Sequence, residues 1–211
     1  MKLRFGLLYP IINYTGKPLN CLVLKTEFKE LAGFRKGKKI MDRGQIQIYT
    51  GDGKGKTTAA LGLALRAICA GKKVFIGQFV KGMDYSELKA PSLLPGLELK
   101  QFGSDNFIYQ QPTEKDKLLA QEGLQLCKEI IIKGEHDLII LDELNIALYY
   151  QLFPLEAVMD LIRSKAKHQE LIITGRKAPQ ALIDLADLVT EMKEVKHYYQ
   201  KGLPARKGIE Y

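Results

Sequence analysis

The stretch that decides the fold reads Gln45-Ile46-Gln47-Ile48-Tyr49-Thr50 and then Gly51-Asp52-Gly53-Lys54-Gly55-Lys56-Thr57-Thr58. The first part predicts a strand, and the apolar spacing over 56–70 predicts a helix. A strand that runs through a glycine-rich turn into a helix is the context of a phosphate-binding loop. Glycines at 51, 53 and 55 let the backbone take positive φ and turn its N–H groups toward an anion at the helix N-terminus. We therefore predict a P-loop that holds the triphosphate of ATP.

Each loop residue has an expected role in this prediction. Lys56 supplies a positive charge to the β- and γ-phosphate oxygens, and the hydroxyl of Thr57 is offered to Mg²⁺ (or Mn²⁺). The pattern G-x-x-x-x-G-K-[ST] places its first glycine where this chain has Thr50, so the match is partial. The alternative is a flexible glycine turn with incidental lysines. The residues predicted to bind ATP are Gly51, Asp52, Gly53, Lys54, Gly55, Lys56, Thr57 and Thr58.

Outward from the loop, short apolar runs alternate with longer helical periods. This alternation is typical of a parallel sheet covered by helices. We expect an α/β, P-loop NTPase-like fold with a mostly parallel five- or six-stranded sheet and helices on both faces. Thr113 and Asp116 form a weak capping-box pattern before a helix over 113–133, and Pro154 and Pro179 mark two further helix starts. The strand candidates are 45–50, 73–78, 97–102, 137–141, 170–174 and 188–192.

Two carboxylates follow the apolar run 138–141, namely Asp142 and Glu143. Ligands of open α/β sheets sit at the carboxyl ends of the strands, and a hard cation prefers oxygen ligands. We expect Glu143 to bind Mg²⁺ directly and Asp142 to hold a coordinated water or Thr57. The alternative is a polar strand end followed by a helix cap.

The first 43 residues differ from the rest of the chain. They carry ten Lys and Arg against three acidic residues, whereas the other 168 residues are nearly neutral. We predict a basic N-terminal extension over 1–43 and one domain over 44–211. The extension is interpreted as a lid, a dimer arm or an upstream stretch before a true start at Met41. Nucleic-acid binding is not favoured, because no aromatic stacking pattern accompanies the basic run.

The whole chain excludes several other classes of protein. No apolar run approaches the roughly 18 residues of a membrane span, and no signal-peptide pattern opens the chain. The three cysteines are far apart and have no histidines at metal-ligand spacing, which argues against disulfides and zinc. We expect a cytoplasmic location and no membrane partner.

Several blocks in a fixed order resemble the P-loop type ATP:cob(I)alamin (corrinoid) adenosyltransferases. The resemblance covers Arg43 to Tyr211 and includes the glycine already shifted to position 51. The blocks are Arg43-Gly44, Thr50–Ala60, Gln78-Phe79-Val80-Lys81-Gly82, Leu141-Asp142-Glu143-Leu144-Asn145, Ile173-Thr174-Gly175-Arg176, Ala186–Met192, Val195-Lys196-His197 and Lys207-Gly208-Ile209-Glu210-Tyr211.

The resemblance implies transfer of the 5′-deoxyadenosyl group of ATP to Co(I) of cob(I)alamin or a related corrinoid, with release of triphosphate, in coenzyme B12 synthesis or salvage. It implies a triphosphate reversed relative to that of P-loop hydrolases and a homodimer, with a flavodoxin-like reductase as a candidate electron donor. We expect catalytic roles for Lys56, Glu143 and Arg176. The resemblance also places Phe107 and Tyr109 against the lower face of the corrin, although relatives often have Trp at the second position. Without the family, Phe107 and Tyr109 are interpreted as packing residues.

Alternatives stay open at this point. A P-loop ATPase or kinase would act at the γ-phosphate and release ADP, and a third reading is a nucleotide-dependent binding protein that uses the basic arm. Arg176 is interpreted either as a phosphate contact or as half of a structural salt bridge. Lys81 and Asn145 follow neighbouring strands and are expected to face one crevice, and His197 is interpreted as a structural residue or part of the corrinoid surface.

Overall fold

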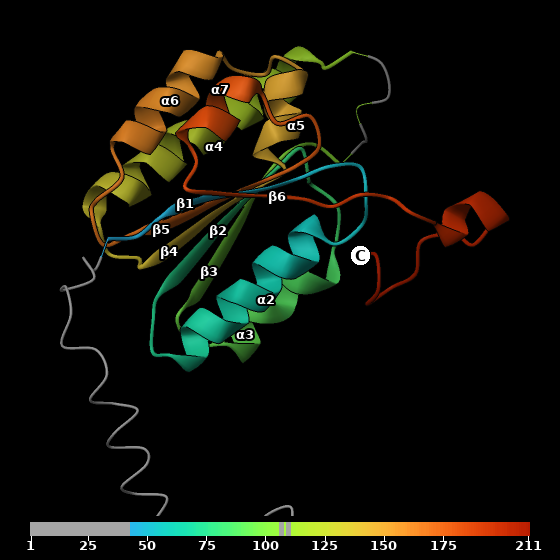
Figure 1. Cartoon of the computed structure of the whole chain (residues 1–211), viewed down its shortest axis with the longest axis horizontal. Coiled ribbons are helices and arrows are strands. Elements are labelled where there is room, and N and C mark those ends of the chain that lie inside the picture. Colours follow the sequence, from blue (N-terminus) through green and yellow to red (C-terminus); the bar gives the residue numbers. More distant parts are fainter. Residues whose placement is uncertain (1–42, 106–107, 109–110) are drawn as a thin grey trace, which may run out of the picture. The chain divides into compact units, whose positions relative to one another are not determined.

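The described part of the protein is built around one six-stranded sheet whose strand pairs are all parallel (Figure 1). The computed structural model describes residues 43–105, 108 and 111–211. The sheet order is β3-β2-β4-β5-β1-β6. All six strand predictions are confirmed, with ends that agree within one residue. The strands are β1 (Ile46–Thr50), β2 (Val74–Phe79), β3 (Leu97–Phe102), β4 (Leu138–Asp142), β5 (Glu170–Thr174) and β6 (Leu188–Glu191).

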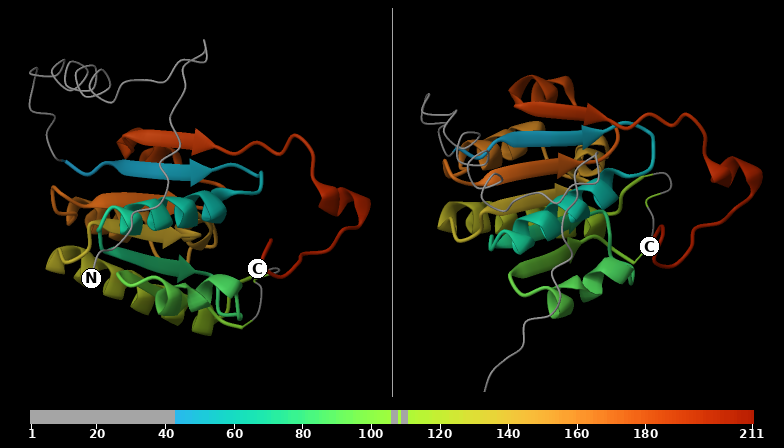
Figure 2. Two further views of the ribbon diagram at one scale, coloured as in Figure 1. Left: turned by 90° about the horizontal axis from the view of Figure 1, so that it is seen from below. Right: turned by 60° about the horizontal axis from the view of Figure 1, so that its bottom comes forward.

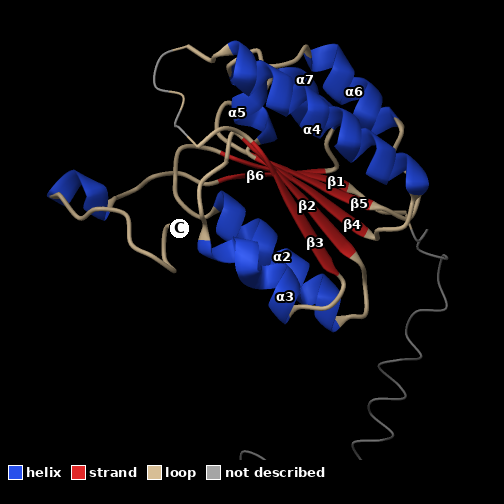
Figure 3. Ribbon diagram, turned by 180° about the vertical axis from the view of Figure 1, so that it is seen from behind, coloured by secondary structure: helices blue, strands red, loops and turns tan. Residues whose placement is uncertain are grey.

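Helices cover both faces of the sheet, as predicted for the fold class (Figure 3). One face carries α2 (Lys56–Cys69) and α3 (Ala90–Leu93). The opposite face carries α4 (Glu114–Lys133), α5 (Leu144–Tyr149), α6 (Leu155–Arg163) and α7 (Gln180–Leu185). Two short 3₁₀ helices, η1 (Ser86–Lys89) and η2 (Tyr198–Lys201), lie in connections. No described helix has the length and apolar character needed to cross a membrane.

The helix starts follow the predicted signals. The Thr113 hydroxyl accepts from the Asp116 N–H (3.2 Å), and the Asp116 carboxylate accepts from the Thr113 N–H (2.8 Å), which completes the capping box of α4. Pro154 and Pro179 stand directly before α6 and α7, at the cap positions.

Two hydrophobic clusters fill the space between the sheet and its helices. Successive strand residues point to opposite faces, so Ile76 packs with Ala60 and Ala64 of α2. Its neighbour Phe75 joins the larger cluster beneath α4 and α6. Phe75 and Ile76 are both buried. This packing fixes the sheet and hence the ends of its strands.

Polar residues of the predicted site lie at the carboxyl ends of the strands. From β1 the chain crosses over β5 and β4 to form β2 and β3, and it then returns to form β4 and β5 in the middle of the sheet. In open parallel sheets, the point at which the strand order reverses in this way marks the ligand crevice. The phosphate loop follows β1, Asp142 ends β4 and Thr174 ends β5. After β6 the chain runs outward and then returns, so that its end lies beside this edge (Figure 2). Of the predicted extension over 1–43, only Arg43 belongs to the described residues.

Candidate active site

The glycine loop makes the turn predicted for it, but by two glycines instead of three. Gly51 has φ +92° and Gly55 has φ +121°, values that favour glycine. Gly53 does not have positive φ, so that prediction is wrong for this residue. Its N–H donates to the carbonyl of Met192 (2.7 Å), and a Cβ at this position would lie 2.7 Å from the same oxygen. Gly53 is therefore required by close contact with the chain after β6.

Lys56 lies folded into the loop. Its Nζ donates to the carbonyls of Gly51 (2.8 Å) and Gly53 (2.7 Å), and the residue is buried. Burial lowers the pKa of the Lys56 ammonium, and the nearby Glu143 carboxylate opposes that shift. The lysine is thus held at the N-terminus of α2, where a phosphate group would be expected.

Asp142 organises the centre of the site. Its carboxylate accepts hydrogen bonds from the hydroxyls of Thr57 (2.8 Å) and Thr174 (2.7 Å), and from Lys81 Nζ (2.8 Å). Only 1% of the Asp142 surface is exposed. These contacts give Asp142 the role expected for it as the partner of Thr57. They also join β4 to α2, to β5 and to the segment after β2.

Glu143 differs from its neighbour in both backbone and side chain. Its φ of +57° is unusual for a residue with a Cβ, and its N–H donates to the Thr174 hydroxyl (3.0 Å). Its carboxylate accepts no hydrogen bond from a described residue. Burial raises the pKa of the Glu143 carboxyl, and the negative charge of Asp142 raises it further.

The donor set fits a hard divalent cation. The Glu143 carboxylate and the Thr57 hydroxyl both line the cavity and offer oxygen atoms, and Asp142 orients the hydroxyl. Among residues 43–105, 108 and 111–211, no group of three or more His, Cys, Asp or Glu side chains could hold a metal. A cation at this place would therefore take the rest of its ligands from phosphate oxygens and water, as Mg²⁺ commonly does.

A cavity of about 540 Å³ connects these groups. It contains most of the predicted ATP residues together with Glu143, Arg176 and Lys81, whereas Gly51, Asp52 and Asp142 are not among its lining residues. Arg176 Nε is 4.0 Å from Asp52 Oδ1, and both side chains are more than half exposed, so the pair is a weak surface contact. The lining of the cavity also includes residues without a predicted role: Leu61, Tyr85, Ser86, Glu87, Gly208, Ile209, Glu210 and Tyr211.

The C-terminal segment, residues 197–211, is the main part of the site that sequence reasoning missed. Lys54 Nζ lies 2.9 Å from the Ile209 carbonyl, 2.9 Å from Glu210 Oε1 and 3.2 Å from the Tyr198 hydroxyl. The sequence signals of this segment were His197, which was interpreted as a structural residue or part of the corrinoid surface, and the block 207–211, which carried the resemblance without an assigned function.

The three other residues discussed in the sequence analysis, Lys81, Asn145 and His197, do not all line the cavity. Lys81 lines the cavity, as expected, but Asn145 does not. Asn145 is fully buried and donates through Nδ2 to the Gly175 carbonyl (3.1 Å), so its contact is with the chain after β5. His197 lines the cavity, and its Nδ1 accepts from the Tyr199 N–H (3.0 Å).

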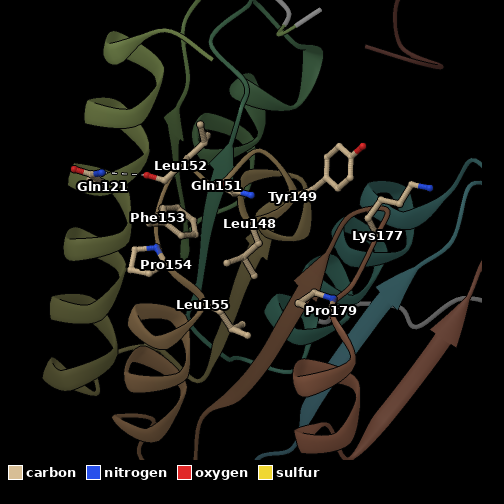
Figure 4. A pocket seen from close by; sticks show the side chains of 10 residues that line it. All are labelled: Gln121, Leu148, Tyr149, Gln151, Leu152, Phe153, Pro154, Leu155, Lys177 and Pro179. Atoms are coloured by element: carbon tan, nitrogen blue, oxygen red, sulfur yellow. Dashed lines mark hydrogen bonds between the residues drawn. The ribbon is translucent and has the colours of Figure 1, made fainter. Parts of the chain in front are cut away.

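The predicted corrinoid residues Phe107 and Tyr109 lie outside the described residues. Between them, the Ile108 carbonyl accepts from the Tyr150 hydroxyl (3.1 Å). A separate cavity of about 640 Å³ lies by the connection from α5 to α6 (Figure 4). It is bordered mostly by apolar side chains, among them Leu148, Phe153 and Leu155, and none of the predicted site residues that the structure describes lines it. It is therefore distinct from the phosphate site.

The parallel sheet, the glycine loop and the Asp142-bound Thr57 together define a P-loop nucleotide-binding protein. Residues 42–211 match the model of the family described as ATP:corrinoid adenosyltransferase BtuR/CobO/CobP. The chain belongs to this family, and the resemblance seen in the sequence is confirmed. The family name gives ATP as the co-substrate and a corrinoid as the acceptor.

Curated relatives agree with the family assignment. The chain is 36% identical to a corrinoid adenosyltransferase of Escherichia coli strain K12 over 184 residues, which is 87% of this chain and 93% of the relative. It is 37% identical to the corrinoid adenosyltransferase CobA of Salmonella typhimurium over 171 residues, 81% and 87% of the two chains. The corresponding enzyme of Pseudomonas aeruginosa is 33% identical over 172 residues, 81% and 85% of the two chains.

Proposed function

We propose that this protein transfers the 5′-deoxyadenosyl group of ATP to the Co(I) centre of a cob(I)alamin-like corrinoid. The cobalt–carbon bond forms with the electron pair of Co(I), the bond between C5′ and its phosphate oxygen breaks, and triphosphate leaves with that bonding pair. The observation that carries the proposal is the cavity that joins Lys56, Glu143 and Lys81 in a chain of this family.

The residues of the cavity suit a reaction in which triphosphate is the leaving group. Co(I) is itself a strong nucleophile, so the protein has to place C5′ in line with cobalt and stabilise the departing negative charge. Lys56 lies at the N-terminus of α2 and would exchange its two carbonyl partners for phosphate oxygens. Arg176 extends from the end of β5 into the same cavity and would add a second cation.

We further propose that Thr57 and Glu143 hold Mg²⁺ or Mn²⁺, with Asp142 as the acceptor that fixes the Thr57 hydroxyl. When bound, the cation would neutralise charge on the triphosphate. The raised pKa of the Glu143 carboxyl supports this assignment, because a carboxylate that accepts no hydrogen bond from a described residue gains from a nearby positive charge.

The corrinoid side rests on the family resemblance. Phe107 and Tyr109 are proposed to press on the lower face of the corrin and displace its axial ligand, which makes Co(II) easier to reduce. Replacing either by alanine should slow the reaction from Co(II) more than the reaction from chemically prepared Co(I). Equal losses from both starting states would argue against this role. A flavodoxin-like reductase is the proposed electron donor.

The product distinguishes this function from the main alternative. The protein, ATP, Mg²⁺ and a reduced corrinoid should give a light-sensitive alkylcobalt spectrum and one triphosphate per adenosyl group transferred. Reactions without ATP and without corrinoid are the controls. A P-loop ATPase or kinase would act at the γ-phosphate and form ADP. ADP and orthophosphate as the only products would overturn the proposal.

The organisation of the whole protein is also proposed from the resemblance. Residues 44–211 would form the catalytic domain and residues 1–43 a basic extension, a division that the family match over 42–211 supports. We propose a homodimer in the cytoplasm, where ATP and the reductant are present. Light scattering of the full chain would test the dimer, and a monomeric mass at micromolar concentration would contradict it.

A further inference from the structure

Lys54 uses its whole hydrogen-bonding capacity on the C-terminal segment. An ammonium group has three N–H donors, and Lys54 has three acceptors, in Tyr198, Ile209 and Glu210. The carboxylate of Glu210 raises the pKa of the Lys54 ammonium, so the group stays charged. In this arrangement no donor of Lys54 is left for a phosphate oxygen. Among the described residues, Lys56 donates its hydrogen bonds to carbonyls of the loop itself.

The C-terminal segment is fixed at two places on the cavity. At one, Glu210 accepts hydrogen bonds from Lys54, from the Tyr198 hydroxyl and from the Arg206 N–H (2.7 Å). At the other, the Ser86 hydroxyl donates to the carbonyl of Tyr211 (2.9 Å). Lys54 belongs to the phosphate loop and Ser86 to the connection after β2. The last residues of the chain therefore bridge two connections that line the same cavity.

The cavity lining is chemically divided. The phosphate loop, Lys81 and Arg176 supply the positive charge and N–H donors that a triphosphate needs. The remaining lining contains apolar and aromatic side chains from Leu61, Tyr85, Ile209 and Tyr211. Flat aromatic and apolar surfaces suit a purine and a ribose, which a triphosphate site alone does not require.

We propose that the C-terminal segment is the wall of the site that contacts the nucleoside half of ATP, and that Lys54 is the positioning residue that fastens this wall to the phosphate loop. This inference rests on the proposed function, because ATP is taken as the ligand. It assigns substrate recognition to residues 209–211 and removes Lys54 from the direct phosphate ligands.

Binding of two ligands by calorimetry tests the assignment. ATP has the nucleoside and inorganic triphosphate lacks it, while both present phosphates to the loop. Lys54→Ala should weaken ATP binding about tenfold and change triphosphate binding by less than about twofold. Lys72→Ala removes an exposed lysine before β2, outside the cavity, and should change neither affinity. Equal weakening of both ligands by Lys54→Ala would make Lys54 a phosphate ligand and overturn the proposal.

A second variant separates positioning from charge. Glu210→Gln removes a negative charge, so a purely electrostatic effect would strengthen triphosphate binding and ATP binding alike. If Glu210 holds the wall, the same substitution should weaken ATP binding selectively. This variant also serves if Lys54→Ala fails to fold. Unchanged or stronger ATP binding by Glu210→Gln would contradict the inference.

A fluorescent reporter gives a readout that is independent of activity. The chain contains no Trp, so Tyr211→Trp introduces a single indole at the cavity. ATP should shift and saturate its emission with the affinity measured by calorimetry, and triphosphate should shift it much less. If ATP binds and the emission does not change, the inference fails while the proposed function stands. If wild-type protein binds ATP but yields ADP, the proposed function fails, and the contact of the C-terminal segment with ATP can still be measured by the emission of Tyr211→Trp.

Discussion

Lys81 and Asp142 form a buried ion pair across neighbouring strand ends, with 2.8 Å between Nζ and Oδ2. The two side chains are 12% and 1% exposed. Burial alone would lower the pKa of Lys81, but the carboxylates of Asp142, Glu87 and Glu143 together outweigh it and the pKa is raised overall. The pair joins the carboxylate that orients Thr57 to a cation that lines the cavity.

Asp142→Asn should therefore destabilise the protein as well as abolish adenosyl transfer. The substitution takes the nearer carboxylate from the largely buried Lys81 and leaves Glu87, 3.7 Å away, as its ion-pair partner. We expect a cost of up to about 3 kcal/mol. Urea unfolding would measure the loss. The double variant Lys81→Met/Asp142→Asn should lose less than the sum of the two single variants, because the ammonium that Asp142→Asn deprives of its nearer carboxylate is removed as well. Additive losses would show that the two residues do not interact.

Lys56→Ala should abolish adenosyl transfer, and it should lower the free energy of unfolding by no more than Asp142→Asn does. The ammonium lies against the glycine loop, and its removal also takes the donor from the Gly51 and Gly53 carbonyls. Loss of these hydrogen bonds should lower the free energy of unfolding by about 1–3 kcal/mol. Turnover and ATP binding measured beside a thermal melt would separate the two effects. Wild-type turnover in this variant would remove the phosphate-site hypothesis.

The sheet and the phosphate loop were predictable because their signals are local. Each strand is four to six residues long, β2, β4 and β5 are mainly apolar, and the loop combines glycines with Lys56 and Thr57 in one short stretch. Positive φ was correctly expected at Gly51 and Gly55 from residue type alone. Gly53 was predicted wrongly because its requirement comes from Met192, which is distant in the sequence. Residue type limits which backbone conformations are available, and the contact with Met192 selects the conformation that Gly53 adopts.

The rest of the site depends on pairings that one sequence does not contain. The bonds of Asp142 to Lys81 and Thr174 follow from β2 and β5 both lying next to β4. Lys54 and Glu210 are 156 positions apart and lie in no periodic pattern that would join them. The exposure of the segment 198–211 along most of its length gives it no apolar signal either.

Gln151→Gly should stabilise the protein without touching the phosphate cavity. Gln151 follows the end of α5 with φ +53°, a conformation that costs a residue with a Cβ about 1 kcal/mol. Its N–H donates to Leu148 O (2.9 Å) and the N–H of Leu152 donates to Ala147 O (3.0 Å), which is the pattern that favours glycine after a helix. Thermal unfolding should show the gain. Gln151→Ala keeps the Cβ and should stay within about 0.5 kcal/mol of wild type.

Asp116 should give the stability a pH dependence at the start of α4. Burial acts to raise its pKa, but hydrogen bonds from Ser104 (2.6 Å) and Thr113 outweigh this and lower the pKa. The folded pKa is below the unfolded value, so the stabilisation is complete above about pH 4 and is lost as pH falls through the folded pKa. Asp116→Ala should cost about 1–2 kcal/mol at pH 7 and less near pH 2. Glu122→Ala, at an exposed position of the same helix, is the matched control. An equal cost at both pH values would contradict the capping role.

Two glycine-to-alanine substitutions should have opposite effects on stability. A Cβ at Gly53 would meet the Met192 carbonyl at 2.7 Å and the Lys193 carbonyl carbon at 2.9 Å, both of them backbone atoms. Overpacking of this kind costs about 1–3 kcal/mol. The displaced chain leads into the C-terminal segment, so ATP affinity should fall as well.

Gly62 is the matched position, in the interior of α2, where a Cβ would meet nothing within 4 Å. Gly62→Ala should raise the free energy of unfolding by about 1 kcal/mol, because alanine loses less backbone entropy in a helix. Urea unfolding of both variants and ATP titration of Gly53→Ala measure the contrast. If Gly53→Ala were as stable as Gly62→Ala and bound ATP normally, the close contact between the phosphate loop and the chain after β6 would have no role in the site.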